Sequence, residues 1–160
     1  MLRRKQVFLI SFLAVLIIAG LIVSMAVAGP RLTAQQKRCL SSWDKAVAGL
    51  KASKWGIASI DEVKSMIDAE VPIFILDVRM TKDRDKDGAI AGSTHIPITE
   101  LAEKIDLLPD DTNSLIIVHC KSGWTGVMAM TILRQLGYDN CKNMKGGFMA
   151  WAKAGYPIEK

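Results

Sequence analysis

Apolar runs of strand length alternate with helical patterns along most of the chain. Ile73 to Val78 and Leu115 to His119 are continuous apolar runs, which are typical of central strands covered on both faces of a parallel sheet. Cys141 to Met144 is a third, shorter candidate strand. Because helical patterns separate these runs, the sequence predicts an α/β fold, an open parallel sheet flanked by helices on both faces.

Apolar spacing and end signals predict the helices around this sheet. A capping box of Ser59 and Glu62 begins the first helix. Its apolar positions share one helical face and are Ile60, Val63, Met66 and Ile67. Glycines mark the ends of two later helices. The later predicted helices are Thr99 to Leu107, Gly126 to Leu136 and Gly147 to Lys153.

An amphipathic helix is also predicted ahead of the sheet. Thr33 and Gln36 form a capping box at its start, and helical spacing continues to about Ala52, before a break near Lys54-Trp55-Gly56. Its apolar side needs a partner, either the following domain or a membrane surface. The apolar residues on that side are Leu40, Trp43, Val47 and Leu50.

The start of the chain has the pattern of an export segment. Three basic residues at positions 3–5 precede an uncharged run from Gln6 to Pro30. Ala26-Val27-Ala28 matches a cleavage site, whereas the run is also long enough to span a bilayer as an N-terminal apolar helix. Residues 1–28 are therefore predicted to be a signal peptide or a membrane anchor. Either route places the chain after Arg31 outside the cytoplasm, periplasmic or otherwise extracytoplasmic, soluble or anchored to the inner membrane.

Three parts are thus predicted: the targeting segment 1–28, the amphipathic helix and linker 29–56, and the α/β domain 57–160. Half of the 160 residues are hydrophobic, which excludes a disordered chain. The net charge is +5, but three of the basic residues lie in the targeting segment, and no basic stripe carries interleaved aromatic residues. Nucleic acid is therefore not a predicted partner.

Cys120 has the sequence position of a nucleophile. It follows the strand Leu115 to His119 and precedes a short loop that leads into the helix at Gly126. A tight strand-to-helix loop directs backbone N–H groups and the positive end of the helix dipole inward, which stabilises an anion. The same surroundings lower the pKa of a thiol, and a thiolate attacks sulfur or phosphorus.

Four segments, occurring in order, resemble the rhodanese-type sulfurtransferases. The resemblance covers residues 57–160 and implies a single rhodanese-like domain. The segments are Leu76-Asp77-Val78-Arg79, Gly92-Ser93-Thr94-His95-Ile96-Pro97, Cys120-Lys121-Ser122-Gly123-Trp124-Thr125, and Lys145-Gly146-Gly147-Phe148-Met149-Ala150-Trp151 with Ala154-Gly155-Tyr156-Pro157.

The resemblance implies a two-step reaction without a cofactor. Cys120 takes a sulfane sulfur from a small anionic donor such as thiosulfate, becomes a persulfide, and passes the sulfur to a thiol or cyanide acceptor. Asp77 and Arg79 are predicted to form a buried ion pair that supports the site. The predicted substrate-binding residues are Lys121, Ser122, Gly123, Trp124, Thr125 and Gly126, whose amides hold the sulfur anion while Lys121 attracts the donor and Trp124 forms the rim.

Departures from the family leave the donor open, and alternatives remain. Thr125 stands where many single-domain members have arginine, so the donor is thiosulfate or another compound. A cysteine phosphatase needs an arginine six positions after the cysteine, where this chain has Gly126. A carrier or non-catalytic module that relays sulfur to a protein partner would also keep Cys120.

Weaker signals are predicted to be structural. Asp83 to Gly88 imitates half of a calcium loop but lacks the glutamate ligand, so a solvated loop without a metal is expected. His119 should point to the opposite side of its strand from Cys120, and His95 should be a hydrogen-bonded structural residue. Whether Cys39 and Cys141 form a disulfide is left open.

Overall fold

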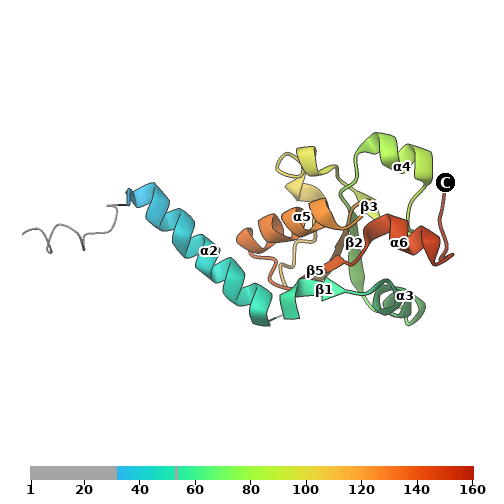
Figure 1. Cartoon of the computed structure of the whole chain (residues 1–160), viewed down its shortest axis with the longest axis horizontal. Coiled ribbons are helices and arrows are strands. Elements are labelled where there is room, and N and C mark those ends of the chain that lie inside the picture. The colour runs from blue at the N-terminus through green and yellow to red at the C-terminus, as the bar shows by residue number, and fades with distance from the viewer. Residues whose placement is uncertain (1–31, 53) are drawn as a thin grey trace, which may run out of the picture. The chain divides into compact units, whose positions relative to one another are not determined.

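Five strands form one parallel sheet in this computed structural model, which describes residues 32–52 and 54–160 (Figure 1). The strand order is β1-β5-β4-β2-β3, and every pairing is parallel. The predicted parallel sheet is therefore confirmed. The strands are β1 (Ile57–Ala58), β2 (Ile73–Asp77), β3 (Thr94–His95), β4 (Leu115–His119) and β5 (Cys141–Met144).

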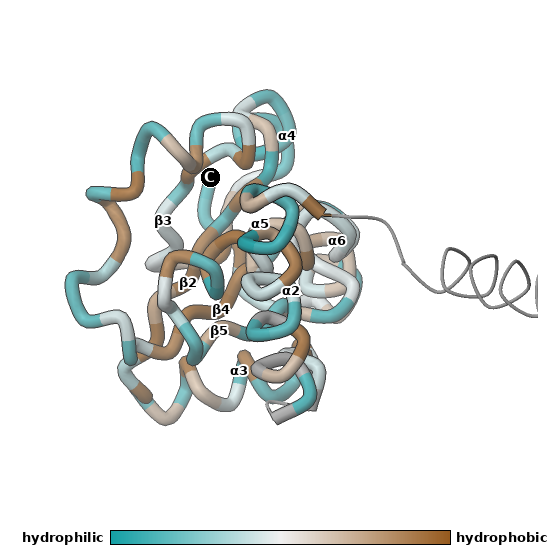
Figure 2. The backbone as a smooth tube through the Cα atoms, turned by 90° about the vertical axis from the view of Figure 1, so that its left-hand side faces the viewer, coloured by the Kyte–Doolittle hydropathy of each residue, from teal (hydrophilic) through white to brown (hydrophobic). Residues whose placement is uncertain are grey.

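The central strands are hydrophobic (Figure 2), and their side chains contribute to a core on each face of the sheet. On one face, Leu76, Ile116 and Val118 pack with residues of α5 (Trp124–Gln135). On the other face, Ile75 and Ile117 pack with residues of α3 (Ile60–Asp68) and α6 (Gly147–Lys153). Helices thus cover both faces, as predicted for strands whose residues are apolar without alternation.

Local signals place the helices that flank the sheet. The Glu62 backbone N–H donates to Ser59 Oγ at 3.0 Å, so Ser59 is the N-cap of α3, the first of the two bonds of the predicted capping box. Helix α6 has the predicted bounds. Helix α5 begins two residues before the prediction, at Trp124, and Gly137 follows it with φ 102°, a left-handed conformation that glycine adopts readily.

The prediction of a helix over Thr99 to Leu107 is wrong. The segment contains two short 3-10 turns, η2 (Ile98–Glu100) and η3 (Ile105–Leu107). Leu101 and Leu108 are buried in the core, whereas Ile105 between them is half exposed. A continuous helix would place these three residues on one side, so the chain breaks its helical path to bury both leucines.

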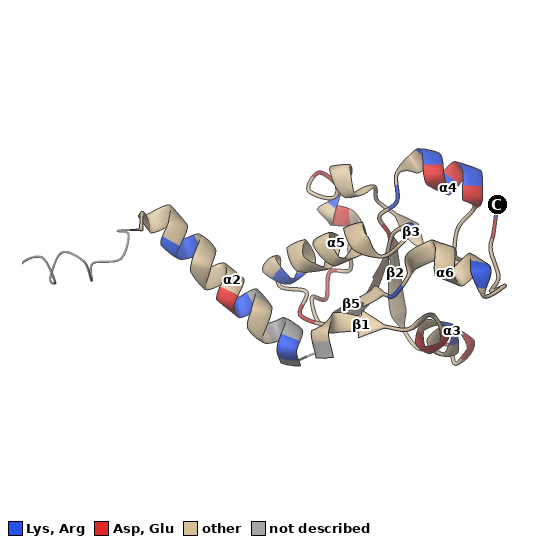
Figure 3. Ribbon diagram, viewed as in Figure 1, with Lys and Arg blue, Asp and Glu red and all other residues tan. Residues whose placement is uncertain are grey.

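The prediction of a loop over Asp83 to Gly88 is also wrong, because most of this segment lies in helix α4 (Thr81–Asp87). This seven-residue helix buries none of its side chains and carries charges of both signs (Figure 3). It therefore has no apolar stripe, the signal on which helix prediction depends. The strands β1 and β3 were not predicted either, because each has only two residues and so shows no apolar pattern.

Helix α2 (Ala34–Ala52) begins at the predicted capping box. The Thr33 N–H donates to Gln36 Oε1 at 2.8 Å, and the Gln36 N–H donates to Thr33 Oγ1 at 3.2 Å. The chain then breaks as predicted, in a 3-10 turn η1 (Lys54–Gly56). The partner of the apolar side of α2 stays a prediction.

The predicted targeting segment, residues 1–28, lies outside the described residues. Within residues 32–52 and 54–160, no helix has both the length and the apolar character needed to cross a bilayer. The predicted boundaries at residues 28 and 56 stay predictions.

Candidate active site

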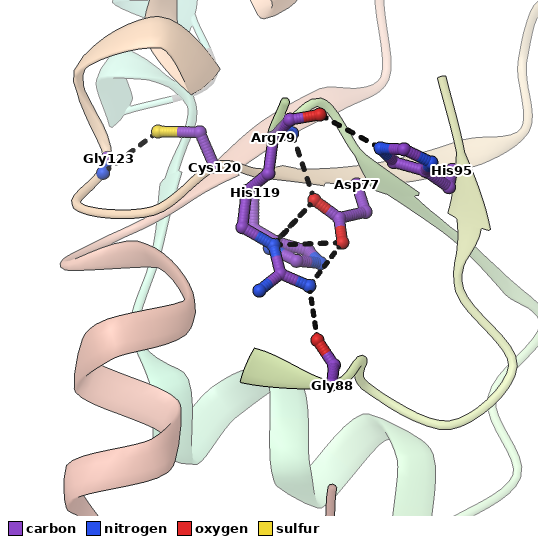
Figure 4. Close-up of polar contacts among 7 residues, drawn as sticks. All are labelled: Asp77, Arg79, Gly88, His95, His119, Cys120 and Gly123. Atoms are coloured by element: carbon purple, nitrogen blue, oxygen red, sulfur yellow. Dashed lines mark hydrogen bonds and ion pairs between the residues drawn. The ribbon is translucent and has the colours of Figure 1, made fainter. Parts of the chain in front are cut away.

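Cys120 lies at the carboxyl end of β4, in the loop that connects this central strand to α5. Ligand sites of parallel sheets occur beyond these strand ends. Only 2% of the Cys120 surface is exposed, and its sulfur accepts a hydrogen bond from the Gly123 N–H at 3.1 Å (Figure 4). The backbone of Gly123 is left-handed with φ 103°, which turns the loop back over the sulfur.

The loop lowers the pKa of the Cys120 thiol. Burial alone would raise this pKa, but hydrogen bonds from the Thr125 hydroxyl and from the N–H groups of Gly126, Gly123 and Ser122 outweigh burial. These donors stabilise a negative charge on sulfur more than they stabilise a neutral thiol. The site therefore favours a thiolate, or another sulfur anion, at this position.

Asn143 on β5 hydrogen-bonds the loop that contains Cys120. It is buried, and its Nδ2 donates to the Gly123 carbonyl at 3.3 Å. A Cβ atom at Gly126 would lie 2.2 Å from Asn143 Oδ1, so a side chain at position 126 would require the Asn143 amide to move. The position that carries arginine in a cysteine phosphatase is thus a glycine packed against the Asn143 amide.

Helix α6 holds the loop from the other side. Its Phe148 N–H donates to the Cys120 carbonyl at 2.8 Å, and its Met149 N–H donates to the Lys121 carbonyl at 2.9 Å. Gly147 allows this close approach, because a Cβ atom there would lie 2.4 Å from the Cys120 oxygen. Two amides that would otherwise lack partners at the helix start are thereby satisfied by the cysteine loop.

A buried ion pair lies beneath the same edge of the sheet. The Arg79 Nη2 is 2.6 Å from Asp77 Oδ2 and also donates to the Gly88 carbonyl at 2.6 Å, and neither charged side chain is exposed. The guanidinium carbon is 3.8 Å from the centroid of the Phe148 ring. The predicted Asp77–Arg79 pair is present, and it connects β2 with α6, the helix that holds the cysteine loop.

The two histidines are structural, as predicted. Figure 4 shows the Cys120 side chain directed toward Gly123, whereas the His119 ring lies beside Asp77 and Arg79. His119 is fully buried, and its ring stacks on Phe148 with a centroid distance of 6.3 Å. The His95 Nε2 hydrogen-bonds the Arg79 carbonyl at 2.9 Å. His119 is therefore not placed to take a proton from Cys120.

His119 should make the stability of the domain depend on pH. Burial lowers its pKa to about 4, against about 6.5 in an unfolded chain, even though Asp77 partly opposes this shift. Between these values the unfolded chain binds more protons than the folded chain, so stability falls as the pH falls from 6.5 to 4. The expected loss is up to about 3 kcal/mol.

Urea unfolding of the wild type and of a His119→Gln variant, measured at several pH values from 7 to 4, checks this expectation. The variant should show a smaller loss of stability across this window, whatever its stability at pH 7. Parallel curves for the two proteins would contradict the assignment to His119.

The sequence comparison decides the family. A model of the rhodanese-like domain matches residues 59–154. The chain belongs to the rhodanese-like domain family.

Known rhodanese relatives agree with this membership. A sulfurtransferase of Allochromatium vinosum is 29% identical over 86 residues, covering 54% of this chain and 78% of that protein. A mouse thiosulfate sulfurtransferase/rhodanese-like domain-containing protein 3 is 26% identical over 136 residues, covering 72% of this chain and 85% of that protein. The crystal structure of a rhodanese-related protein from Thermoplasma volcanium has 31% identity and a TM-score of 0.56, covering 64% of this chain and 95% of that one.

A pocket of about 240 Å³ opens over Cys120 in this rhodanese-like domain. Lys121 and Trp124 line it as predicted, and Trp124 is 83% exposed at the rim. The Lys121 ammonium, predicted to attract an anionic donor, is already paired with Asp83 of α4 at 2.7 Å. The remaining lining contains three apolar side chains, Val78, Met80 and Ile98, and three polar ones, Arg79, Ser122 and Thr125.

Sequence reasoning missed Asn143 and Asp83 as residues of this region. One signal for Asn143 was available, because an asparagine that a strand buries needs hydrogen-bond partners. Asp83 had none, because its contact with Lys121 joins residues 38 positions apart.

The three cysteines are free thiols in the structure. Cys39 is exposed, whereas Cys141 is fully buried in β5, and burial raises the pKa of Cys141 to about 12. The Cys141 thiol is thus held neutral, in contrast to the Cys120 thiol. The pairing of Cys39 with Cys141 that the sequence left open stays open.

Proposed function

We propose that this rhodanese-type sulfurtransferase moves a sulfane sulfur from thiosulfate or a related donor to a thiophilic acceptor through a persulfide on Cys120. The observation that carries the proposal is the position of the Cys120 sulfur, which lies beneath a pocket and accepts hydrogen bonds from the loop that follows it. The membership of the rhodanese-like domain family supports the same reaction class.

In the first step, the Cys120 thiolate attacks the outer sulfur of thiosulfate. A bond forms between the two sulfurs while the bond to the sulfonate sulfur breaks, and sulfite leaves with the electron pair. The product is a persulfide anion whose negative charge lies on the outer sulfur. The N–H groups of Ser122, Gly123 and Gly126 then face a negative charge before and after the step, so the loop stabilises both states.

In the second step, a nucleophilic acceptor attacks the outer sulfur of the persulfide. The bond between the two sulfurs breaks, its electron pair returns to Cys120, and the thiolate is regenerated. Cyanide would leave as thiocyanate, and a thiolate acceptor would leave as a persulfide. No oxidant or cofactor is consumed, because the sulfur changes partners without net electron loss.

We also propose that the protein is exported, with residues 1–28 acting as a signal peptide or as an anchor. The basic start, the uncharged run and the small residues at positions 26 and 28 support this proposal. The mass of the mature protein isolated from its host distinguishes cleavage from retention, because cleavage removes the whole segment.

The function is tested with the full chain, thiosulfate and cyanide. Intact mass after thiosulfate treatment should increase by one sulfur atom, and peptide mapping should locate that atom on Cys120 and not on Cys39 or Cys141. Thiocyanate should then form over many turnovers. A sulfur adduct without thiocyanate formation would favour the carrier that relays sulfur to a protein partner. The absence of both, with Cys120 shown to be reduced, would contradict transfer from thiosulfate.

A further inference from the structure

The basic side chains that line the Cys120 pocket each form an ion pair with an acidic residue. Among the described residues that line the pocket, the basic ones are Arg79 and Lys121. Arg79 is buried, and its Nε and Nη2 bond Asp77 and the Gly88 carbonyl, whereas its buried Nη1 has no hydrogen-bond partner among the described residues. Lys121 bonds Asp83. A negatively charged donor that enters the pocket therefore meets no basic side chain that lacks an acidic partner within this lining.

The Lys121–Asp83 contact joins the cysteine loop to α4 across the pocket. The Lys121 side chain is 50% exposed and the Asp83 side chain 32% exposed, so donors from solvent can reach both. Each partner favours the charged form of the other, which raises the pKa of Lys121 and lowers the pKa of Asp83. Asp87, one turn further along α4, also acts on Lys121 and adds negative potential at the same place.

Apart from the polar Ser122 and Thr125, the rest of the lining suits an apolar group. Val78, Met80, Ile98 and Trp124 border the same cavity as Cys120. A donor whose transferable sulfur reaches Cys120 would place its other end among these side chains. An alkyl group loses contact with water there, which is favourable, whereas a second negative charge loses hydration without gaining an unpaired cation.

We propose that Asp83 is a specificity-determining residue, which neutralises Lys121 and thereby favours donors with one negative charge and an apolar group, such as alkyl thiosulfonates, over the thiosulfate dianion. This inference rests on the proposed sulfur transfer at Cys120. With a thiosulfonate, the Cys120 thiolate attacks the outer sulfur, the bond to the sulfonyl sulfur breaks, and the sulfinate leaves with the electron pair. The total charge is conserved in this step, as it is with thiosulfate. The two donors therefore differ in how the pocket binds them and not in the kind of reaction.

Asp83→Asn tests the inference in the full chain, with cyanide as the common acceptor and with methanethiosulfonate and thiosulfate as donors. Freeing Lys121 should raise kcat/KM for thiosulfate by about two- to fivefold, the effect expected of an exposed charge pair. The value for methanethiosulfonate should rise less, so selectivity for it falls. Added salt should shrink the difference between the two donors. The matched control is Asp85→Asn, an exposed residue of the same helix that does not line this pocket, and it should leave selectivity unchanged.

A second measurement does not require sulfur transfer. Iodoacetate and iodoacetamide alkylate the same thiolate, but only iodoacetate is charged, so the ratio of their rates at Cys120 reports how the pocket receives an anion. Asp83→Asn should raise the rate with iodoacetate relative to iodoacetamide, with Cys120 modification followed by peptide mass.

The outcomes separate the two proposals. If both donors are turned over and Asp83→Asn changes neither selectivity nor the alkylation ratio, the role of Asp83 is overturned while the sulfur transfer stands. If neither donor is turned over but the alkylation ratio changes, the donor preference and the proposed function are overturned, and only the effect of Asp83 on anion entry is upheld.

Discussion

Replacing Arg79 by methionine is expected to destabilise the domain by about 3–5 kcal/mol, because the buried Asp77 carboxylate then loses its counter-charge. Burial by itself raises the pKa of Asp77, and the hydrogen bonds of Arg79 reverse this and hold the pKa below its usual value. Without Arg79, Asp77 must either remain a buried anion or take up a proton. The Gly88 carbonyl and the Phe148 ring lose their contacts with the guanidinium as well.

Urea unfolding of the full chain checks this loss. Lys104→Met is a matched control, since it also removes a basic partner from an ion pair, but its pair with Glu100 is exposed. The control should unfold close to the wild type. If Arg79→Met lost no more stability than Lys104→Met, the buried pair would not have the structural role given to it here. A double variant that also carries Asp77→Asn should recover part of the loss, because it leaves no unpaired buried charge.

Replacing Cys120 by serine is expected to reduce sulfur transfer by more than about 10³-fold, because a hydroxyl remains protonated under conditions in which this thiol forms an anion. Serine has nearly the same shape, so the loop should fold as before. Thiocyanate formation and intact mass measure the effect. Cys39→Ser is the matched control, since Cys39 is exposed on α2 and does not line the pocket, and it should leave the rate unchanged.

The pH dependence of the wild type gives a second test of the same thiol. The alkylation rate of Cys120 should rise with pH as the thiolate forms, with a midpoint below the usual pKa of cysteine, because the loop donors favour the anion. Retention of transfer activity in Cys120→Ser would contradict the role of this residue. A midpoint at or above the usual cysteine value would contradict the role of the loop.

The parts of the fold that local sequence determines were predicted correctly. The capping signals at Thr33 and Ser59 act within four consecutive residues: both bonds of the box form at Thr33, and the N-cap bond forms at Ser59. The runs at Ile73 and Leu115 are apolar without alternation, so a buried strand is the structure that suits them. Cys120 could be placed at a strand end for the same reason, because both the strand before it and the glycine turn after it are local features.

The parts that were mispredicted depend on contacts between distant segments. Leu101 and Leu108 are drawn to the sheet, which breaks a helix that their spacing favours. Helix α4 has no apolar stripe, so its pattern resembles a loop. Asp83 reaches Lys121 only after β2, α4 and β4 have taken their places, and no local pattern reports such a pair.

The contact between the cysteine loop and α6 has a consequence for synthesis. A chain is made from its amino end, and the amides of Phe148 and Met149 each lie 28 residues after the carbonyl that they hold, that of Cys120 or of Lys121. A nascent chain that has just exposed Cys120 therefore carries the thiol without its full support. The cysteine loop therefore gains these two hydrogen bonds only after α6 has been synthesised and has packed against it.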